Sequence, residues 1–410
     1  MNILFLTLTK LTSLDDTMVY TDMLHSFAEF GHSVYAICPL ENKDRKENYI
    51  EQRESIHLLH TNIGGDYFNV NSVEKGLTLL KLEKGYIKGI RENYADIRFD
   101  LVLYTTPPIT FNKVVQYVKR RDGAMSYLML KDIFPQNAVD MEMMSKTGIK
   151  GIIYKYFRRK EKELYNVSDY IGCMSPANIE YLRKHNREID KAKIELSPNS
   201  IVIRDLSVST TKRKEIRNKY SIPLEKKVFV YGGNLGKPQG IDFLVECLQK
   251  ARDIDGIFLI IGDGTERYRL QEYFDREKPN NVILMNRLEK DEYDLLVSSC
   301  DVGMVFLDHR FTIPNFPSRI LSYMQAKIPT LAVTDTASDI GLIIREGNFG
   351  WWCESNSSED FLKEVKVALR ADLRILGENG FNYLKNHYDV NDNARAILAH
   401  VASKKIENII

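Results

Sequence analysis

Three glycine- or proline-rich segments carry the residues best suited to binding a phosphate group. In the first, Tyr231–Gly240, an apolar run ends in a glycine pair at Gly233, and Asn234 and Lys237 follow. Glycines let the backbone approach a ligand closely, and a helix predicted from Ile241 would offer unpaired amide groups. The spacing of Lys237 is not that of a Walker A loop. The segment predicts either an anion site or a tight turn without a ligand.

The other two segments lie later in the chain. Gly262 and Gly264 follow an apolar run, with Arg267 in the place of a third glycine, so the dinucleotide fingerprint is only partial. In the third segment, Ser318 would begin a helix and Arg319 would lie in its first turn. A cation there opposes the helix dipole unless an anion lies beside it. Phosphate binding at Arg319 competes with a solvent-exposed arginine, and nucleotide binding at the glycines competes with a structural turn.

One carboxylate in the first half of the chain is the candidate for proton transfer. Asp132 follows the apolar run Tyr127–Leu130, where a carboxylate can take part in proton transfer; the alternative is a helix N-cap. Histidines and cysteines show no metal-ligand spacing. The D-x-D sequence at Asp253 lies in a charged connection between a helix and a strand. We therefore expect no metal site.

The elements that must position these residues alternate along the chain. Short, nearly continuous apolar runs separated by helical patterns predict parallel sheets with helices on both faces. The polar stretch Ser207–Asn218 separates two such series, so we place a domain boundary near residue 202. The predicted fold class is α/β, with two doubly wound Rossmann-like domains facing a central cleft, the usual ligand site. The expected elements include strands Ile3–Thr9, Val34–Cys38, Ile56–His60, Leu101–Thr105, Val228–Tyr231 and Phe258–Gly262, and helices Val19–Phe30, Ile241–Ala251 and Glu359–Leu369.

The composition argues against several other classes of protein. The chain has 410 residues, of which 44% are hydrophobic and 28% charged, as is typical of globular proteins. Lys and Arg number 57 against 56 Asp and Glu, so the net charge of +1 gives no support for nucleic-acid binding. Five scattered cysteines indicate a reducing compartment. Because no apolar run could span a bilayer and no signal-peptide pattern is present, we predict a cytoplasmic protein.

Taken together, the three segments resemble motifs of the family 4 retaining glycosyltransferases, which have the GT-B fold. The resemblance is to the bacterial capsule and O-antigen members, described as fucosaminyltransferase-like. Their second domain reads Y-x-G-N-x-G-K-x-Q-G, G-x-G and P-S-K-x-x-E-Y-M-A-x-G-K-P, which match Tyr231–Gly240, Gly262–Gly264 and Pro317–Pro329. In the first domain, Asp132–Gln136 resembles D-L-W-P-E, and Ser197–Ser200 resembles I-P-N-G.

The resemblance implies transfer of a sugar from a nucleotide-activated donor. Residues 203–387 would bind a UDP-sugar, and residues 1–202, completed by a C-terminal helix at 388–410, would bind the acceptor. We expect an N-acetylated sugar, a polyprenyl-diphosphate-linked saccharide acceptor, and neither metal nor cofactor. The donor diphosphate would meet Gly233, Asn234, Lys237 and Arg319, and the nucleotide and ribose would meet Gly262, Gly264, Arg267, Ser318 and Ser322. Asp132 would orient the acceptor hydroxyl or assist its deprotonation.

Ser322 departs from the family pattern, which has a glutamate at this place to hold the ribose hydroxyls. A serine can make one hydrogen bond to them but lacks the two acceptor oxygens of a carboxylate. Two other functions therefore stay open. One is a sugar-nucleotide epimerase with the same fold, and the other is a catalytically degenerate subunit that binds a partner.

Two basic amphipathic segments raise the question of a membrane. Ile149–Glu163 and Val73–Arg91 combine lysines and arginines with apolar residues at helical spacing. Such helices can lie on an anionic leaflet, or they can be solvated faces over a stripe that packs on the core. Because the acceptors of capsule-type relatives are lipid-linked, we expect peripheral contact with the inner face of the cytoplasmic membrane.

Overall fold

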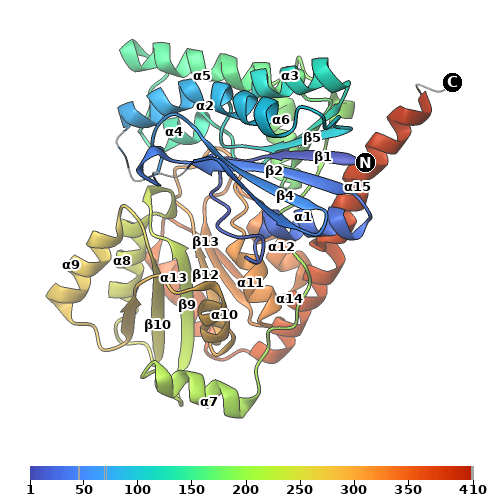
Figure 1. Cartoon of the computed structure of the whole chain (residues 1–410). Helices are drawn as coiled ribbons and strands as arrows, with labels where there is room; N and C mark the ends of the chain where they lie inside the picture. The colour runs from blue at the N-terminus through green and yellow to red at the C-terminus, as the bar shows by residue number, and fades with distance from the viewer. Residues whose placement is uncertain (45–46, 69, 71, 408–410) are drawn as a thin grey trace. The chain divides into compact units, whose positions relative to one another are not determined.

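The computed structural model describes residues 1–44, 47–68, 70 and 72–407. The chain forms two compact units, shown in Figure 1. Unit 1 comprises Met1–Ile201 together with the chain from Val390 onward, and unit 2 comprises Val202–Asp389. The chain therefore passes between the units twice, and its last helix belongs to unit 1. In the part of the chain that the structure describes, no helix has both the length and the apolar character needed to cross a membrane.

Unit 1 is built on a largely parallel sheet. Its strands are β1 (Asn2–Leu6), β2 (Ser33–Leu40), β3 (Tyr49–Arg53), β4 (Ile56–Asn62), β5 (Leu101–Thr105), β6 (Met125–Leu130), β7 (Tyr170–Cys173) and β8 (Ile194–Leu196). Their order across the sheet is β3-β4-β2-β1-β5-β6-β7-β8, and β3 pairs antiparallel with β4. The order reverses direction between β1 and β5, which makes this half doubly wound, as predicted.

Helices cover both faces of this sheet. They are α1 (Val19–Glu29), α2 (Ser72–Asn93), α3 (Asn112–Asp122), α4 (Gln136–Asp140), α5 (Gly148–Val167), α6 (Pro176–His185) and α15 (Val390–Glu407). Figure 1 shows α2, α3 and α5 on one face and α1 and α15 on the other. The helix α15 packs on α1, and its Asn393 bonds to Ser197 and Ser200 at the end of the first stretch of chain.

Unit 2 has a wholly parallel sheet. Its strands are β9 (Lys227–Asn234), β10 (Gly256–Asp263), β11 (Val282–Met285), β12 (Val302–Phe306), β13 (Thr330–Thr334) and β14 (Gly350–Glu354). Their order is β11-β10-β9-β12-β13-β14, so the switch point falls between β9 and β12. The helices are α7 (Thr210–Lys219), α8 (Ile241–Lys250), α9 (Arg267–Glu277), α10 (Lys290–Ser298), α11 (Arg319–Gln325), α12 (Ile340–Gly347), α13 (Ser358–Ala368) and α14 (Leu373–His387).

The core of unit 2 explains why its strands read as continuous apolar runs. Phe229 of β9 stacks on Phe258 of β10 with ring centroids 5.4 Å apart, and Phe361 of α13 lies 5.8 Å from Phe306 of β12. All four side chains are essentially inaccessible to solvent. Because both faces of each strand are buried in this way, the alternation typical of half-exposed strands is absent.

Two strands of unit 1 differ from the sequence-based expectation. The first strand was expected to run to Thr9, but β1 ends at Leu6, because Thr7 turns its hydroxyl back to accept a bond from the backbone amide of Thr9. The edge strand β3 was not predicted at all, since its residues are mostly exposed and polar. An edge strand with one neighbour has little apolar pattern to detect.

Candidate functional sites

The loop that follows β9 has a shape fixed by its own side chains. The amide oxygen Oε1 of Gln239 accepts hydrogen bonds from the backbone amide of Gly236 and from Nδ2 of Asn234, each at 3.1 Å. Gly233 is exposed and has a φ of +121°, a conformation that disfavours any side chain. Asn234 therefore holds the loop in shape, which sequence reasoning had not assigned to it.

The glycines at the carboxyl end of β10 are required by its close contact with the end of β9. A Cβ atom on Gly262 would lie 1.9 Å from the carbonyl oxygen of Gly233, and one on Gly264 would lie 2.5 Å from the backbone of Leu235. The amide of Leu235 donates to the carbonyl of Asp263 at 2.9 Å in the same contact. These glycines thus place the second segment directly against the first, so the turn has a structural reason whether or not a nucleotide binds there.

Arg319 lies beside the same loop. Its guanidinium carbon lies 4.5 Å from the centre of the Tyr231 ring and 3.6 Å from the position that a Cβ of Gly233 would take. The residue is partly buried, and its Nη1 atom is buried without a hydrogen-bond partner among the described residues. Arg319 is therefore not the solvent-exposed arginine of the alternative interpretation. A buried donor on a permanent cation is costly to leave unpaired, so the arrangement suits an anion.

Two tyrosines pack against the segment around Gly232, at the end of β9. The hydroxyl of Tyr323 donates to the carbonyl of Met304 at 3.0 Å and accepts from the amide of Gly232 at 3.4 Å. The hydroxyl of Tyr293 lies only 2.0 Å from the position of a Cβ on Gly232, so a larger residue there would collide with it. Sequence reasoning missed both tyrosines, because their role arises from a contact between segments far apart in the chain.

The loops after β12 and β13 are also braced. The amide of Asp308 donates to the carbonyl of Pro238 at 3.0 Å, which ties the β12 loop to the β9 loop. Asp335 is buried and accepts from the amide and the hydroxyl of Ser338, whose oxygen accepts in turn from the amide of Asn315. Burial raises the pKa of Asp335 to about 6, against opposing hydrogen bonds from Ser338. This chain of contacts fixes the segment that leads to Arg319.

The remaining predicted donor-site residues lie around the same edge of the sheet. Lys237 is partly exposed at the start of a short 3₁₀ helix. Arg267 begins α9, and its Nε is buried without a hydrogen-bond partner among the described residues, while Nη1 reaches Gln271 at 3.4 Å. Ser318 precedes α11 as its N-cap but makes no side-chain capping bond. Ser322 is partly exposed in the first turns of α11.

In unit 1, Asp132 lies just beyond the carboxyl end of β6. Both of its carboxylate oxygens accept from Nδ2 of Asn137, at 2.8 and 2.7 Å. The hydroxyl of Thr106 accepts from the amide of Asp132 at 3.1 Å and donates to its carbonyl at 3.0 Å. The next helix, α4, begins at Gln136 with Pro135 as its N-cap, so the alternative that Asp132 caps a helix is wrong.

Asp132 and its neighbour Lys131 have strongly shifted pKa values. Burial raises the pKa of Asp132 to about 6, although hydrogen bonds from the Ile133 backbone and Asn137 oppose the shift. Burial lowers the pKa of Lys131 to about 7, and its Nζ donates to the carbonyl of Ser197 at 3.3 Å. Two adjacent groups that titrate near neutral pH are suited to proton transfer. Sequence reasoning did not single out Lys131, because burial of a lysine at a strand end leaves no local pattern.

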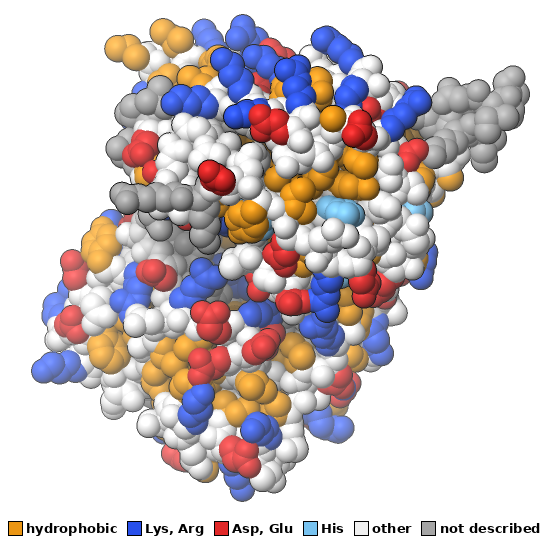
Figure 2. Space-filling model, in the orientation of Figure 1, with side chains coloured by type: hydrophobic (Ala, Val, Ile, Leu, Met, Phe, Trp, Pro, Cys, Tyr) orange, Lys and Arg blue, Asp and Glu red, His pale blue; other side chains and the backbone are white. Residues whose placement is uncertain are grey.

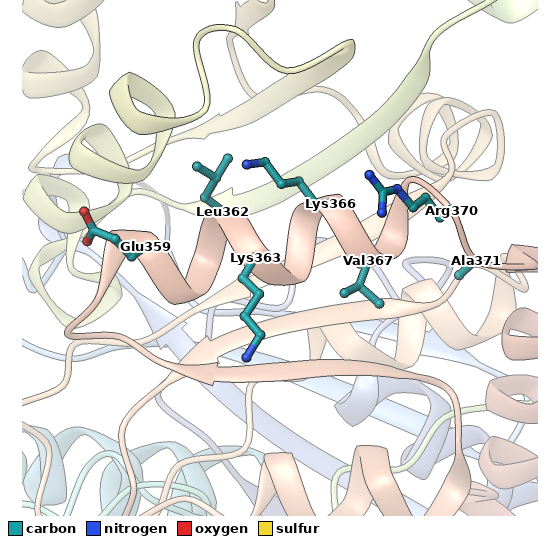
Figure 3. A pocket seen from close by; sticks show the side chains of 7 residues that line it. All are labelled: Glu359, Leu362, Lys363, Lys366, Val367, Arg370 and Ala371. Atoms are coloured by element: carbon teal, nitrogen blue, oxygen red, sulfur yellow. The ribbon is translucent and has the colours of Figure 1, made fainter.

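A separate hollow in unit 2 runs along α13 and is shown in Figure 3. It is lined by Glu359, Leu362, Lys363, Lys366, Val367, Arg370 and Ala371. Its far end reaches the amino end of β9, where Lys227 donates to the carbonyls of Leu369 and Ala371. The hollow is thus distinct from the loops that hold Arg319. Among the described residues, no group of three or more His, Cys, Asp or Glu side chains is arranged to hold a metal ion.

Comparison with known proteins shows what the chain, and unit 2 in particular, is similar to. Residues 212–382 match the family model described as Glycosyl transferases group 1. The chain is 24% identical over 303 residues to the probable glycosyltransferase WbjE of Pseudomonas aeruginosa, with 71% of each chain covered. It is 20% identical over 249 residues to the putative colanic acid biosynthesis glycosyl transferase WcaI of Escherichia coli (strain K12), with 59% of each covered.

A solved structure extends the likeness to the whole chain. HepE of Anabaena in complex with UDP-glucose is similar with a TM-score of 0.71 at 13% identity, covering 98% of this chain and 99% of that one. Residues 212–382 of unit 2 are thus similar to the Glycosyl transferases group 1 family. The whole chain has an α/β fold with two Rossmann-like sheets, the fold of GT-B glycosyltransferases. The predicted α/β fold class with two Rossmann-like sheets is confirmed.

Proposed function

We propose that the protein is a retaining glycosyltransferase of the capsule or O-antigen type, close to the fucosaminyltransferase-like members. It transfers a sugar, N-acetylated in our proposal, from a UDP-sugar to a polyprenyl-diphosphate-linked saccharide during synthesis of a surface polysaccharide. It acts in the cytoplasm at the inner face of the membrane. The observation that carries the proposal is Arg319, a partly buried cation with an unpaired Nη1 beside the glycine loop at the switch point of unit 2.

The donor side needs stabilisation of a leaving diphosphate. When the bond between the sugar and the phosphate breaks, negative charge develops on the departing oxygen, and fixed cations and amide groups lower the barrier. Arg319 is held against Tyr231 before any ligand binds, so little reorganisation is needed. Lys237 adds a second cation, and α8 presents the amide groups of its first turn at the end of the same loop.

The acceptor side needs a group that positions a hydroxyl and helps remove its proton. Asp132 is fixed by Asn137 and has a pKa near 6, so at neutral pH it is largely ionised but still basic enough to accept a proton. In retaining transfer the donor's own phosphate oxygen can take the proton, and Asp132 then serves to orient the hydroxyl. We assign it the orienting role and, secondarily, proton transfer.

The proposal is tested by incubating the purified protein with a panel of UDP-sugars and a polyprenyl-diphosphate-linked acceptor. We expect release of UDP together with a longer lipid-linked saccharide, and an unchanged anomeric configuration in the product by nuclear magnetic resonance. We also expect turnover to continue in the presence of EDTA, because cationic side chains take the place of a metal ion at the diphosphate.

Other outcomes separate the two competing functions. Isomerised sugar nucleotide without UDP release would support an epimerase. Absence of any turnover, followed by turnover in Ser322→Glu, would support a degenerate subunit that has lost its ribose contact. Turnover by the native protein would dismiss the degenerate subunit, since Ser322 would then suffice for donor binding.

A further inference from the structure

The helix α5 in unit 1 leaves an apolar stripe uncovered. Ile149 and Ile152 are 84% and 70% exposed, the two highest values among large hydrophobic residues that the structure describes, and Ile153 is 48% exposed. With the partly exposed Tyr156, these residues recur at steps of three and four, so they lie on one face of the helix. Met143, just before the helix, is 63% exposed. A contiguous exposed patch of this kind marks a surface that meets an apolar partner.

Unpaired positive charge borders the stripe. Lys150 and Lys155 are exposed on either side of it, and neither has an ion-pair partner among the described residues. Farther along α5 the basic residues are paired, for instance Arg158 with Glu161 at 2.6 Å and Lys160 with Glu163 at 2.7 Å. The uncompensated charge is therefore concentrated where the isoleucines are exposed. Lys150 also lies in the first turn, where a cation opposes the helix dipole unless an anion is near.

Neighbouring elements extend the same surface. The helix α3 packs beside α5 and contributes the exposed Arg120 and Lys113. Figure 2 shows hydrophobic side chains next to a concentration of Lys and Arg side chains on the edge of unit 1 where Figure 1 places α2, α3 and α5. Apolar side chains with a fringe of cations match the hydrocarbon boundary and the phosphate layer of an anionic leaflet.

The helix α5 contacts the segment that follows Asp132. The ring of Phe157 on α5 packs edge-on against Phe134 with centroids 5.1 Å apart, and Phe134 is two residues beyond Asp132. The turn before α5 is also held closely, because a Cβ on Gly151 would lie 2.7 Å from the carbonyl oxygen of Lys146. Docking of α5 on a membrane would thus set the position of Asp132 relative to the lipid surface.

We propose that Ile149, Ile152 and Ile153 of α5 insert into an anionic phospholipid leaflet while Lys150 and Lys155 bind its phosphate groups. The inference rests on the proposed function in one respect, since a lipid-linked acceptor gives the docking its purpose. The partner is a phospholipid surface, recognised by negative charge and an accessible apolar layer, and not a single bound lipid.

The test is co-sedimentation of the full chain with lipid vesicles of two compositions. One is phosphatidylcholine alone, and the other contains about 30% phosphatidylglycerol, which supplies the negative surface potential. We expect binding to the anionic vesicles only, weakened by salt. Lys150→Ala combined with Lys155→Ala should weaken binding about thirtyfold, from the loss of two surface cations. Ile149→Asn combined with Ile152→Asn should weaken it about tenfold or more, from the lost apolar burial.

Matched controls come from unit 2. Leu342→Asn with Ile375→Asn changes two residues that are 63% and 51% exposed, and Lys363→Ala with Lys366→Ala changes the basic hollow of Figure 3. Both controls should bind vesicles like the native chain. Thermal unfolding checks that every variant folds. We expect all of them to fold, because the changed side chains are exposed or border a hollow.

Three results would overturn the inference: equal binding to both vesicles, unchanged binding by both α5 variants, or equal losses in the unit 2 controls. Titration of the same proteins with UDP separates this inference from the proposed function. Vesicle binding without UDP binding would leave the docking surface standing and remove the donor site. UDP binding without binding to anionic vesicles would support the donor site and remove the docking surface.

Discussion

At the scale of single residues, the proposed chemistry depends on charged side chains that are partly buried. Arg319 stacks on Tyr231, and its Nη1 is buried without a hydrogen-bond partner among the described residues, so its charge is directed at the loop of Gly233. The residue type and its place at a helix start were evident from the sequence. The unpaired nitrogen was not evident from the sequence. It depends on the packing of Arg319 against Tyr231, which lies 319 − 231 = 88 positions earlier in the chain.

Asp132 gives a prediction at the same scale. Its pKa is raised from an ordinary 3.8 to about 6, so its contribution to stability is present below pH 4 and is lost as the pH rises through 6. Asp132→Asn removes this dependence. Relative to the native protein, the variant should gain about 2 kcal/mol in unfolding free energy between pH 4 and pH 8, as the ionised carboxyl becomes costly in the native fold.

Urea unfolding of both proteins across this pH range measures the difference. A constant difference at all pH values would contradict the raised pKa. Turnover should show the matching effect, rising through pH 6 in the native protein as the carboxylate form is populated. The rise should be absent in Asp132→Asn.

At the scale of elements, the donor site depends on how closely the ends of β9 and β10 approach. Gly262→Ala places a methyl group 1.9 Å from the carbonyl oxygen of Gly233, so backbone must move. We expect a loss of about 1–3 kcal/mol in unfolding free energy, as for overpacking in a core, and weaker nucleotide binding. Gly76→Ala in α2 is the control, since nothing lies within 4 Å of its Cβ position. That change should be neutral or stabilising by up to about 1 kcal/mol.

Thermal unfolding followed by circular dichroism distinguishes the two variants. Equal effects from Gly262→Ala and Gly76→Ala would show that the contact between the β9 and β10 loops is not tight. A destabilised Gly262→Ala that still binds nucleotide with native affinity would mean that the loops approach each other for stability alone, without shaping the ligand site.

The elements themselves were largely predictable from the sequence, for a physical reason. Strands buried on both faces read as apolar runs, and β5 has the predicted bounds Leu101–Thr105. The exposed edge strand β3 left no such pattern. For α5, the sequence showed the apolar residues at helical spacing but not their exposure, because such residues look the same whether they face a core or solvent. Only burial in the folded chain separates these two cases.

At the scale of the whole molecule, the chain folds as two units and passes between them twice, near residues 201 and 390. The helix α15 belongs wholly to unit 1, where Asn393 bonds to Ser197 and Ser200 and the ring of His400 stacks on that of Tyr170 with centroids 3.8 Å apart. A break in composition near residue 202 was readable in the sequence. The partners of α15 were not, because they lie nearly 200 positions earlier, as the separation of Asn393 from Ser197 shows.

The central claim is that unit 2 binds the diphosphate of a UDP-sugar through Arg319. The most direct measurement is calorimetric titration of the native protein with UDP, GDP, dTDP and CMP in the absence of metal. We expect selective binding of UDP, and Arg319→Ala should weaken it about thirtyfold, equivalent to about 2 kcal/mol for a charge-assisted hydrogen bond. Arg370→Ala, an exposed arginine of the α13 hollow, should bind UDP like the native protein. Absence of nucleotide binding, or equal affinity in Arg319→Ala and the native chain, would contradict the account.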